Sequence, residues 1–236
     1  EEIISTLQLI SKIADNHHRL PYFWTKIGKI MQYLIQEIRS QITDFEIYNI
    51  FQNTKYVLLS LLEQGIISPD QKIISDIMTR NDANKFPYRH YLYAGIKSFI
   101  NENDSKMIES EIKQKYNMDI NNFEEKCRTG ENDSYICTLI RQDLVEEFIS
   151  YANRSNASFS SQIKQSIFET NSFLMQKKPS LIEYAAFFGS IQIIQYLQYN
   201  NISLTSSLWP YVIHSDNAEL IHFLEENKVK PQKDAT

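Results

Sequence analysis

The stretch SLIEYAAFFGSIQIIQYL, residues 180–197, returns 27 residues later as SLWPYVIHSDNAELIHFL, residues 207–224. Apolar and aromatic side chains fill matching positions in both copies, and Gly189 of the first aligns with Asp216 of the second. Each copy predicts two short helices that fold back on each other at this small or turn-tolerant residue. Because neither helix can bury its apolar side alone, the repeat predicts that neighbouring copies stack.

Two further segments, 57–65 and 144–153, resemble the second helix of this repeat. The first helix that belongs with 144–153 aligns ambiguously. In the rest of the chain, apolar residues recur at spacings of three and four rather than two, which favours helices over strands. The sequence therefore predicts an all-α fold, a helical-pair solenoid with its clearest repeats in the C-terminal third.

The N-terminal part shows separate helix signals. Apolar stripes predict helices over residues 3–14 and 24–38. Thr43 and Glu46 have the spacing of a capping box, in which each side chain satisfies a free backbone amide of the other residue. These signals predict short helices packed through one face each.

Further helix boundaries follow along the chain. Gly65 stands where a left-handed C-terminal cap is wanted, and Ser68 followed by Pro69 predicts an N-cap with proline at the first helical position. Residues 81–87 predict a loop, and a polar break lies at 130–133. We therefore predict a helical domain over residues 1–130 and degenerate repeats over residues 131–236.

The segment 181–197 resembles an ankyrin repeat. It matches the ankyrin pattern at Ala185-Ala186, Gly189, Ile193-Ile194 and Leu197. Residues 180–183 stand where that family has Thr-Pro-Leu-His, so part of its usual backbone hydrogen bonding is absent. The 27-residue period is also shorter than the usual ~33, which implies a trimmed β-hairpin finger.

Over almost its full length, the chain resembles the N-terminal region of the divergent ankyrin-repeat proteins of trichomonad-type protists. Residues 10–19, 166–174 and 180–227 carry this resemblance. It implies a helical domain of unknown function followed by ankyrin repeats, and it implies no known activity. It also implies an array that continues beyond residue 236 in the full-length protein.

The net negative charge of the chain comes from the segment that holds its clearest repeats. The whole sequence has 24 basic and 29 acidic residues, a formal charge of −5. Residues 179–227 contain five acidic side chains and no Lys or Arg, which leaves 24 of each sign elsewhere. Phosphate binding requires clustered cations, so no nucleic-acid partner is expected. The repeat surface better suits a neutral or basic protein, or further repeats of the same chain.

Few cysteines and no apolar span indicate a chain that works inside the cell. Cys127 and Cys137 are too few for a disulfide framework and lack the spacing of a metal site. The sequence starts at Glu1 without a secretory signal pattern, and no stretch is apolar enough to cross a bilayer. We expect an intracellular, cytoplasmic location.

Candidate catalytic groups are weak. His17 and His18 near Asp15 suggest a base or a metal ligand, but adjacent helical side chains point about 100° apart. His214 and His222 fall on different expected helices and lack further ligands. No phosphate-binding glycine loop or nucleophile motif occurs. We expect no metal, no cofactor and no catalysis.

The candidate binding residues come from the ankyrin resemblance. It implies that the two positions before the turn residue lie on the concave side and contact targets. These positions are Phe187 and Phe188 in one copy and His214 and Ser215 in the next. Large aromatic side chains are common anchors of interfaces. The alternative is that the phenylalanines pack against the preceding helices.

Three functions remain open at this point. The leading hypothesis is a non-catalytic protein-interaction scaffold that binds a protein partner through its repeats. The second is an unrecognised enzymatic or nucleotide-binding role of residues 1–130, through the histidines named above or the cluster from Tyr88 to Tyr93. The third is nucleic-acid binding by a basic surface assembled from distant Lys and Arg residues.

Overall fold

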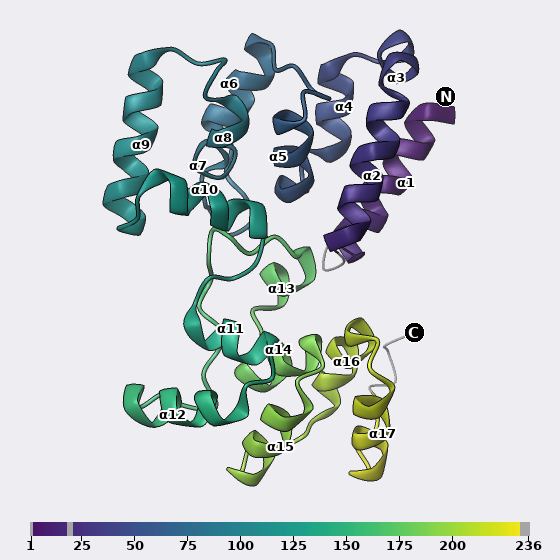
Figure 1. Cartoon of the computed structure of the whole chain (residues 1–236). Coiled ribbons are helices and arrows are strands. Elements are labelled where there is room, and N and C mark those ends of the chain that lie inside the picture. The colour runs from purple at the N-terminus through teal and green to yellow at the C-terminus, as the bar shows by residue number, and fades with distance from the viewer. Residues whose placement is uncertain (1, 18–20, 232–236) are drawn as a thin grey trace. The chain divides into compact units, whose positions relative to one another are not determined.

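The chain is helical throughout the part that the computed structural model describes, residues 2–17 and 21–231 with side chains for 2–13 and 26–231 (Figure 1). Within these residues no strand occurs, and only two isolated bridges form, Asn81 with Pro87 and Gln162 with Ser180. The predicted all-α class is confirmed. In the same residues, no helix is both long enough and apolar enough to cross a bilayer.

The chain divides into two compact units. Unit 1 comprises residues 1–131 and 167–176, and unit 2 comprises residues 132–166 and 177–236. The first division lies one residue from the predicted boundary after residue 130. The return of residues 167–176 to unit 1 has no counterpart in the predicted domains, because that segment carries no repeat signal.

Unit 1 holds ten helices and most of an eleventh among the described residues, and its core is continuous. The buried side chains include Ile47, Leu58, Ile77 and Phe123, all at 0% exposure. The helices are α1 (Glu2–His17), α2 (Pro21–Tyr33), α3 (Ile35–Gln41), α4 (Asp44–Phe51), α5 (Lys55–Glu63), α6 (Gln71–Thr79), α7 (Tyr88–Tyr91), α8 (Tyr93–Ile96), α9 (Glu102–Tyr116), α10 (Ile120–Thr129) and α13 (Ser172–Lys177).

Some predicted boundaries of unit 1 are confirmed. Thr43 and Glu46 form the capping box at the start of α4, with the Thr43 N–H donating to Glu46 Oε2 at 2.7 Å. Gly65 follows α5 with φ +67°, and its N–H donates to the Leu62 carbonyl. Both signals are local in sequence, so the surrounding fold does not override them.

Two predictions about unit 1 are wrong in detail. The N-cap of α6 is Asp70 rather than Ser68, because the Asp70 carboxylate accepts from the Lys72 and Ile73 N–H groups. The single stripe over 24–38 is two helices, α2 and α3, which meet at Leu34. A continuous apolar stripe does not reveal such a break.

The described residues of unit 2 form three helical pairs. They are α11 (Tyr135–Arg141) with α12 (Val145–Ser155), α14 (Leu181–Phe188) with α15 (Ile191–Tyr199), and α16 (Trp209–Ser215) with α17 (Ala218–Glu226). A 3₁₀ turn, Ser206–Leu208, precedes α16. The first helices contact each other in the order α11, α14, α16, and α12 contacts α15. The middle first helix, α14, therefore packs against both α11 and α16.

The period of 27 residues also occurs in unit 1. Helices α4 and α6 begin at Asp44 and Gln71, which are 27 residues apart, and the two helices contact each other. Their N-caps, Thr43 and Asp70, are separated by the same interval. The sequences of these helices are too different to reveal this period.

Two glycines in helices of unit 1 predict opposite effects on stability. A Cβ at Gly95 would lie 2.7 Å from Leu62 Cβ, whereas a Cβ at Gly28 would meet only the end of the flexible Gln64 side chain. Gly95→Ala should therefore lower the free energy of unfolding by about 1–3 kcal/mol. Gly28→Ala should leave it unchanged or raise it by up to about 1 kcal/mol. Urea unfolding followed by circular dichroism measures both, and equal effects would contradict the close approach of α5 and α8.

Candidate functional site

The turns inside the three helical pairs of unit 2 share one backbone geometry. Asp143, Gly189 and Asp216 each follow the first helix of a pair and have φ values of +50°, +74° and +51°. Glycine adopts this left-handed conformation freely, and Asp is among the few other residues that adopt it with modest strain. The two residues before each turn therefore occupy equivalent positions at the ends of α11, α14 and α16.

Hydrogen bonds between consecutive pairs hold these turns in register. Ser190, which is 1% exposed, donates from Oγ to the Ile140 carbonyl at 2.5 Å. Asn217, 27 residues later, donates from Nδ2 to the Gly189 carbonyl at 3.2 Å. Both residues are N-caps of a second helix. The N-cap residue of the second helix thus bonds each of these two pairs to the backbone of the pair before it.

Two carboxylates strengthen the same connections. The Asp143 carboxylate accepts from the Gln192 and Ile193 N–H groups at 3.1 and 3.0 Å, so it caps a helix of the next pair. Glu183 accepts from the Ser180 N–H at 2.9 Å and from Ser207 Oγ at 2.8 Å, which joins the starts of two successive copies. These acidic groups are committed to the fold rather than to a ligand.

The structure separates the four predicted binding residues. Phe187 is fully buried at 0% exposure, with its ring 5.1 Å from Phe188 and 5.4 Å from His214. Phe187 therefore packs in the core, as the alternative interpretation held, and its prediction as a surface anchor is wrong. Phe188, His214 and Ser215 are partly exposed. Whether these three bind a partner stays a prediction.

Phe188 packs against two side chains that are themselves held in place. Its ring centroid is 4.7 Å from that of Tyr184, and the Arg141 guanidinium lies 6.0 Å above it. Arg141 is held in turn, because it donates to the Asn132 carbonyl at 2.8 Å and to Tyr184 Oη at 2.9 Å. Ser215 Oγ donates to the Val212 carbonyl and so serves its own turn. We call Arg141, Phe188 and His214 the turn surface.

Sequence reasoning missed Arg141, although a signal for it existed. Arg141-Gln142-Asp143 has the same form as Phe187-Phe188-Gly189 and His214-Ser215-Asp216, namely two variable residues before a turn-tolerant one. The ambiguity in aligning the first helix hid this match. The left-handed φ of Asp143 resolves the ambiguity.

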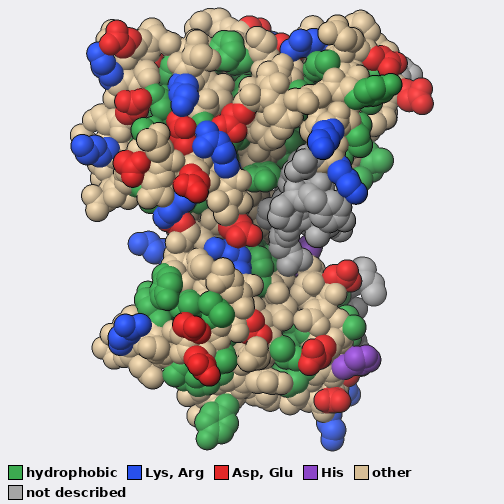
Figure 2. Space-filling view, viewed as in Figure 1, with side chains coloured by type: hydrophobic (Ala, Val, Ile, Leu, Met, Phe, Trp, Pro, Cys, Tyr) green, Lys and Arg blue, Asp and Glu red, His purple; other side chains and the backbone are tan. Residues whose placement is uncertain are grey.

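The turn surface lies in a part of unit 2 that is rich in acidic and apolar side chains. No Lys or Arg occurs between residues 179 and 227. Figure 2 shows green hydrophobic and red acidic side chains together on the visible face of the region that holds α11 to α17, with few blue ones. Arg141 is the cation of the turn surface, whereas residues 179–227 around it bear only acidic charges, which repel phosphate and attract neutral or basic groups.

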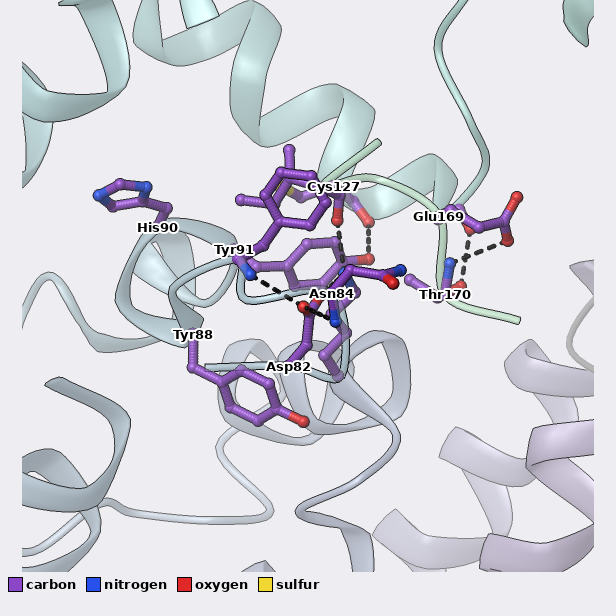
Figure 3. A network of polar contacts seen from close by, with 12 residues as sticks. Asp82, Asn84, Tyr88, His90, Tyr91, Cys127, Glu169 and Thr170 are labelled. Atoms are coloured by element: carbon purple, nitrogen blue, oxygen red, sulfur yellow. Dashed lines mark hydrogen bonds and ion pairs between the residues drawn. The ribbon is translucent and has the colours of Figure 1, made fainter. Parts of the chain in front are cut away.

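Unit 1 contains a buried polar network of a different kind (Figure 3). Lys55 Nζ donates to Asp82 Oδ2 at 2.8 Å, and the two side chains are only 3% and 5% exposed. The other Asp82 oxygen accepts from the Asn84 and Phe86 N–H groups, both at 2.9 Å. The ion pair therefore fixes the 81–87 loop against α5.

The same lysine holds the segment that returns to unit 1. Lys55 Nζ donates to the Ile167 carbonyl at 2.6 Å, and Thr170 Oγ1 donates to the Gly130 carbonyl at 2.7 Å. Glu169 accepts from the backbone N–H of the next residue, so the segment also organises itself. These bonds fasten residues 167–171 to α5 and to the end of α10.

The network is protected rather than reactive. Burial lowers the pKa of the Lys55 ammonium, although Asp82 opposes this change. Burial raises the pKa of the Tyr91 phenol and of the Cys127 thiol well above their ordinary values, so neither is a ready nucleophile. Tyr91 Oη donates to the Cys127 carbonyl at 2.5 Å. The enclosure of these groups supports a role in the fold.

His90 forms a second buried contact on α7, and Figure 3 shows it pointing away from Asp82 and Tyr91. Its side chain is 2% exposed, with Nε2 2.7 Å from Glu111 Oε2 and Nδ1 3.1 Å from Tyr116 Oη. Burial lowers the pKa of the imidazole more strongly than Glu111 raises it. The neutral ring donates from Nε2 and accepts at Nδ1, which satisfies both nitrogens.

The other candidate catalytic residues do not form a site in the described structure. The side chains of Asp15, His17 and His18 lie outside the described residues. His222 is exposed, and its Nδ1 lies 3.3 Å from Glu225, whereas His214 packs on Phe187. Among the residues with described side chains, no three His, Cys, Asp or Glu groups lie close enough to hold a metal ion.

Comparisons with known proteins do not identify a family for this chain. No family model, no curated protein and no solved structure matches it. The resemblance to ankyrin-repeat proteins therefore stays a prediction.

The buried ion pair predicts a large asymmetry between two lysines. Lys55→Met removes the cation that pairs with Asp82 Oδ2 and the donor to the Ile167 carbonyl, so it should lower the free energy of unfolding by about 3–5 kcal/mol. Lys106→Met breaks an exposed ion pair with Glu102 and should change the free energy of unfolding little. Chemical unfolding measures both, and a Lys55→Met protein of wild-type stability would contradict the proposed tie.

His90 predicts a specific dependence of stability on pH. Its pKa in the folded chain lies below the ordinary 6.5, so the unfolded chain binds more protons as the pH falls. The free energy of unfolding therefore keeps its full value with respect to His90 above about pH 6.5 and falls as the pH is lowered below it. The Glu111 pKa is also lowered, but its contribution disappears only below its ordinary 4.5.

Urea unfolding at about pH 7.5 and about pH 5.5 tests this dependence. His90→Gln should reduce the loss of stability between the two values, while His222→Gln, at an exposed position, should retain the wild-type loss. An identical loss in the wild type and His90→Gln would show that the imidazole is not held neutral by burial.

Proposed function

We propose that this chain is a non-catalytic protein-interaction scaffold whose unit 2 is an ankyrin-like array of helical pairs. The observation that carries the proposal is the alignment of three equivalent turns in unit 2, which gathers Arg141, Phe188 and His214 on consecutive first helices. These three side chains are partly exposed, whereas Phe187 beside them is part of the core. A row of this kind is suited to contact a partner over several repeats.

Several contacts support the ankyrin-like description. The first helices follow one another in contact, a left-handed residue ends each of them, and the helices of a pair are joined directly at that turn. Glu183 takes over a stabilising role at the start of its copy, since it binds both Ser180 and Ser207. These bonds compensate for the missing Thr and His of the family pattern.

The chemistry of the turn surface indicates the class of partner. Phe188 offers an aromatic face that is already ordered by Tyr184, so little conformational entropy is lost when a partner covers it. The surrounding repeats bear five carboxylates and no cation between residues 179 and 227. A neutral or basic protein surface with an apolar patch is the partner that fits. The two buried free cysteines suit a reducing, cytoplasmic environment.

The proposal predicts which substitutions weaken partner binding. Phe188→Ala and His214→Ala should each lower the affinity for the partner by about tenfold or more, because each removes an aromatic group from the contact. Tyr199→Ala, at an 87% exposed position at the end of α15, should leave the affinity unchanged. The immobilised chain and its variants are compared for proteins captured from extracts of the source cell and quantified by mass spectrometry.

Salt and stability measurements complete this test. Binding of a basic partner should weaken as ionic strength rises, because exposed charges are screened. Thermal unfolding of each variant shows that it is folded. Equal recovery of every captured protein by the wild type, Phe188→Ala and His214→Ala would contradict the assignment of the turn surface.

A further inference from the structure

A groove of about 350 Å³ lies between α1, α2 and α3 in unit 1. Figure 1 shows the N-terminal half of α1 beside α3 and the end of α2. The lining is mostly aliphatic, and its polar members are two residues near the start of α1 and two on α3. The lining residues are Glu2, Ile3, Thr6, Leu7, Ile10, Ile30, Met31, Leu34, Glu37, Ile38 and Gln41.

The groove has a firm apolar floor and an exposed apolar rim. Leu7, Met31 and Ile38 are 1–2% exposed and belong to the core of unit 1. Ile30 on the rim is 48% exposed and continues the aliphatic lining of the groove to its edge. Covering this groove would remove further apolar surface from water without disturbing the core.

The aliphatic lining of the groove favours a helix over an extended peptide as the occupant. An extended peptide would bring unpaired N–H and C=O groups against aliphatic side chains, which costs free energy. The Thr6 hydroxyl is already committed, because it donates to the Glu2 carbonyl at 2.9 Å. A helix satisfies its own backbone and presents only side chains to the groove.

The length of the groove fits a short helix. The lining residues of α1 run from Glu2 to Ile10, which is about 12 Å along the helix axis. Apolar side chains at positions i, i+4 and i+7 of an occupant helix span about 10.5 Å. Three such anchors therefore match the apolar length of the groove.

The charges of the groove indicate what flanks those anchors. Glu2 and Glu37 are the two charged residues of the lining, and both are acidic. Within the described residues, neither carboxylate forms an ion pair or accepts a hydrogen bond. An occupant with basic residues beside its apolar stripe would give each carboxylate a partner.

We propose that the groove formed by α1, α2 and α3 docks an amphipathic helix of a partner protein, with three apolar anchors flanked by Lys or Arg. This site is separate from the turn surface of unit 2 and does not depend on it. The two sites together would allow one chain to bind two partners.

The test uses the whole chain and a designed probe. The probe is a fluorescent helical peptide of about 16 residues with Leu at i, i+4 and i+7, Lys beside them and Ala elsewhere. Matched peptides carry Glu in place of Lys, or Ser in place of Leu. Fluorescence polarisation should show binding of the Lys peptide at least about tenfold tighter than that of either control peptide.

Substitutions in the chain locate the binding. Ile30→Glu should weaken binding of the Lys peptide by at least about tenfold, and Tyr33→Ser, an 88% exposed position outside the groove, should not. The double variant Glu2→Lys/Glu37→Lys should lose the Lys peptide and bind the Glu peptide instead. This exchange of preference cannot arise from unfolding, which would abolish both interactions.

Three results would overturn the proposal. They are equal affinity of the wild type for the Lys and Glu peptides, no binding of the Lys peptide at concentrations where solubility permits measurement, and an unchanged preference in the double variant. A concentration-dependent dimer that Ile30→Glu abolishes would also overturn it, because the occupant would then be a second copy of the chain. Failure of the turn-surface variants in the capture experiment would leave this test unaffected.

Discussion

A helical pair of this length cannot bury its apolar side alone, and unit 2 depends on that constraint. Helix α14 has eight residues and α15 has nine, yet Ala185, Ala186 and Phe187 are all 0% exposed because α11 and α16 cover them from two sides. The burial of these side chains therefore depends on the stacking of neighbouring pairs. Of the residues before each turn, Phe187 is taken into this core, whereas Phe188, His214 and Ser215 stay partly exposed and are the ones left for a partner.

Unit 1 also contains residues 167–176, a segment separated in sequence from the rest of the unit, and a buried ion pair holds it in place. A buried ammonium is expensive unless each of its hydrogen bonds is satisfied. Lys55 donates to Asp82 and to the Ile167 carbonyl and lies 4.8 Å from the Tyr91 ring centroid, so a loop and the returning segment are fixed by one side chain. Moving residues 167–171 away would leave the buried Lys55 without one of its two named acceptors.

Local signals in the sequence predicted local structure well. The capping box at Thr43, the left-handed Gly65 and the repeat at residues 180–224 depend on neighbours in sequence, and the structure confirms the first two and places matching helices at the third. Signals that depend on distant contacts were beyond reach. The sequence around Lys55 does not indicate that it pairs with Asp82 or bonds to Ile167. Similarly, the sequence does not distinguish Phe187 from Phe188, and only the position of α16 shows that Phe187 is the buried one. The turn position of Arg141 was readable in principle, because Asp143 marks it.

Site-specific photo-cross-linking tests the central claim most directly, since it reports which side chain touches a partner. Phe188 would be replaced by the photoreactive analogue p-benzoylphenylalanine in the full chain, and Tyr199 would be replaced in a matched second protein, since it is exposed on the same unit but lies away from the turns. Both proteins would be irradiated in extract of the source cell. The scaffold account predicts a discrete cross-linked protein from position 188 and none from position 199. Cross-links of equal yield from both positions, or from position 199 alone, would contradict it.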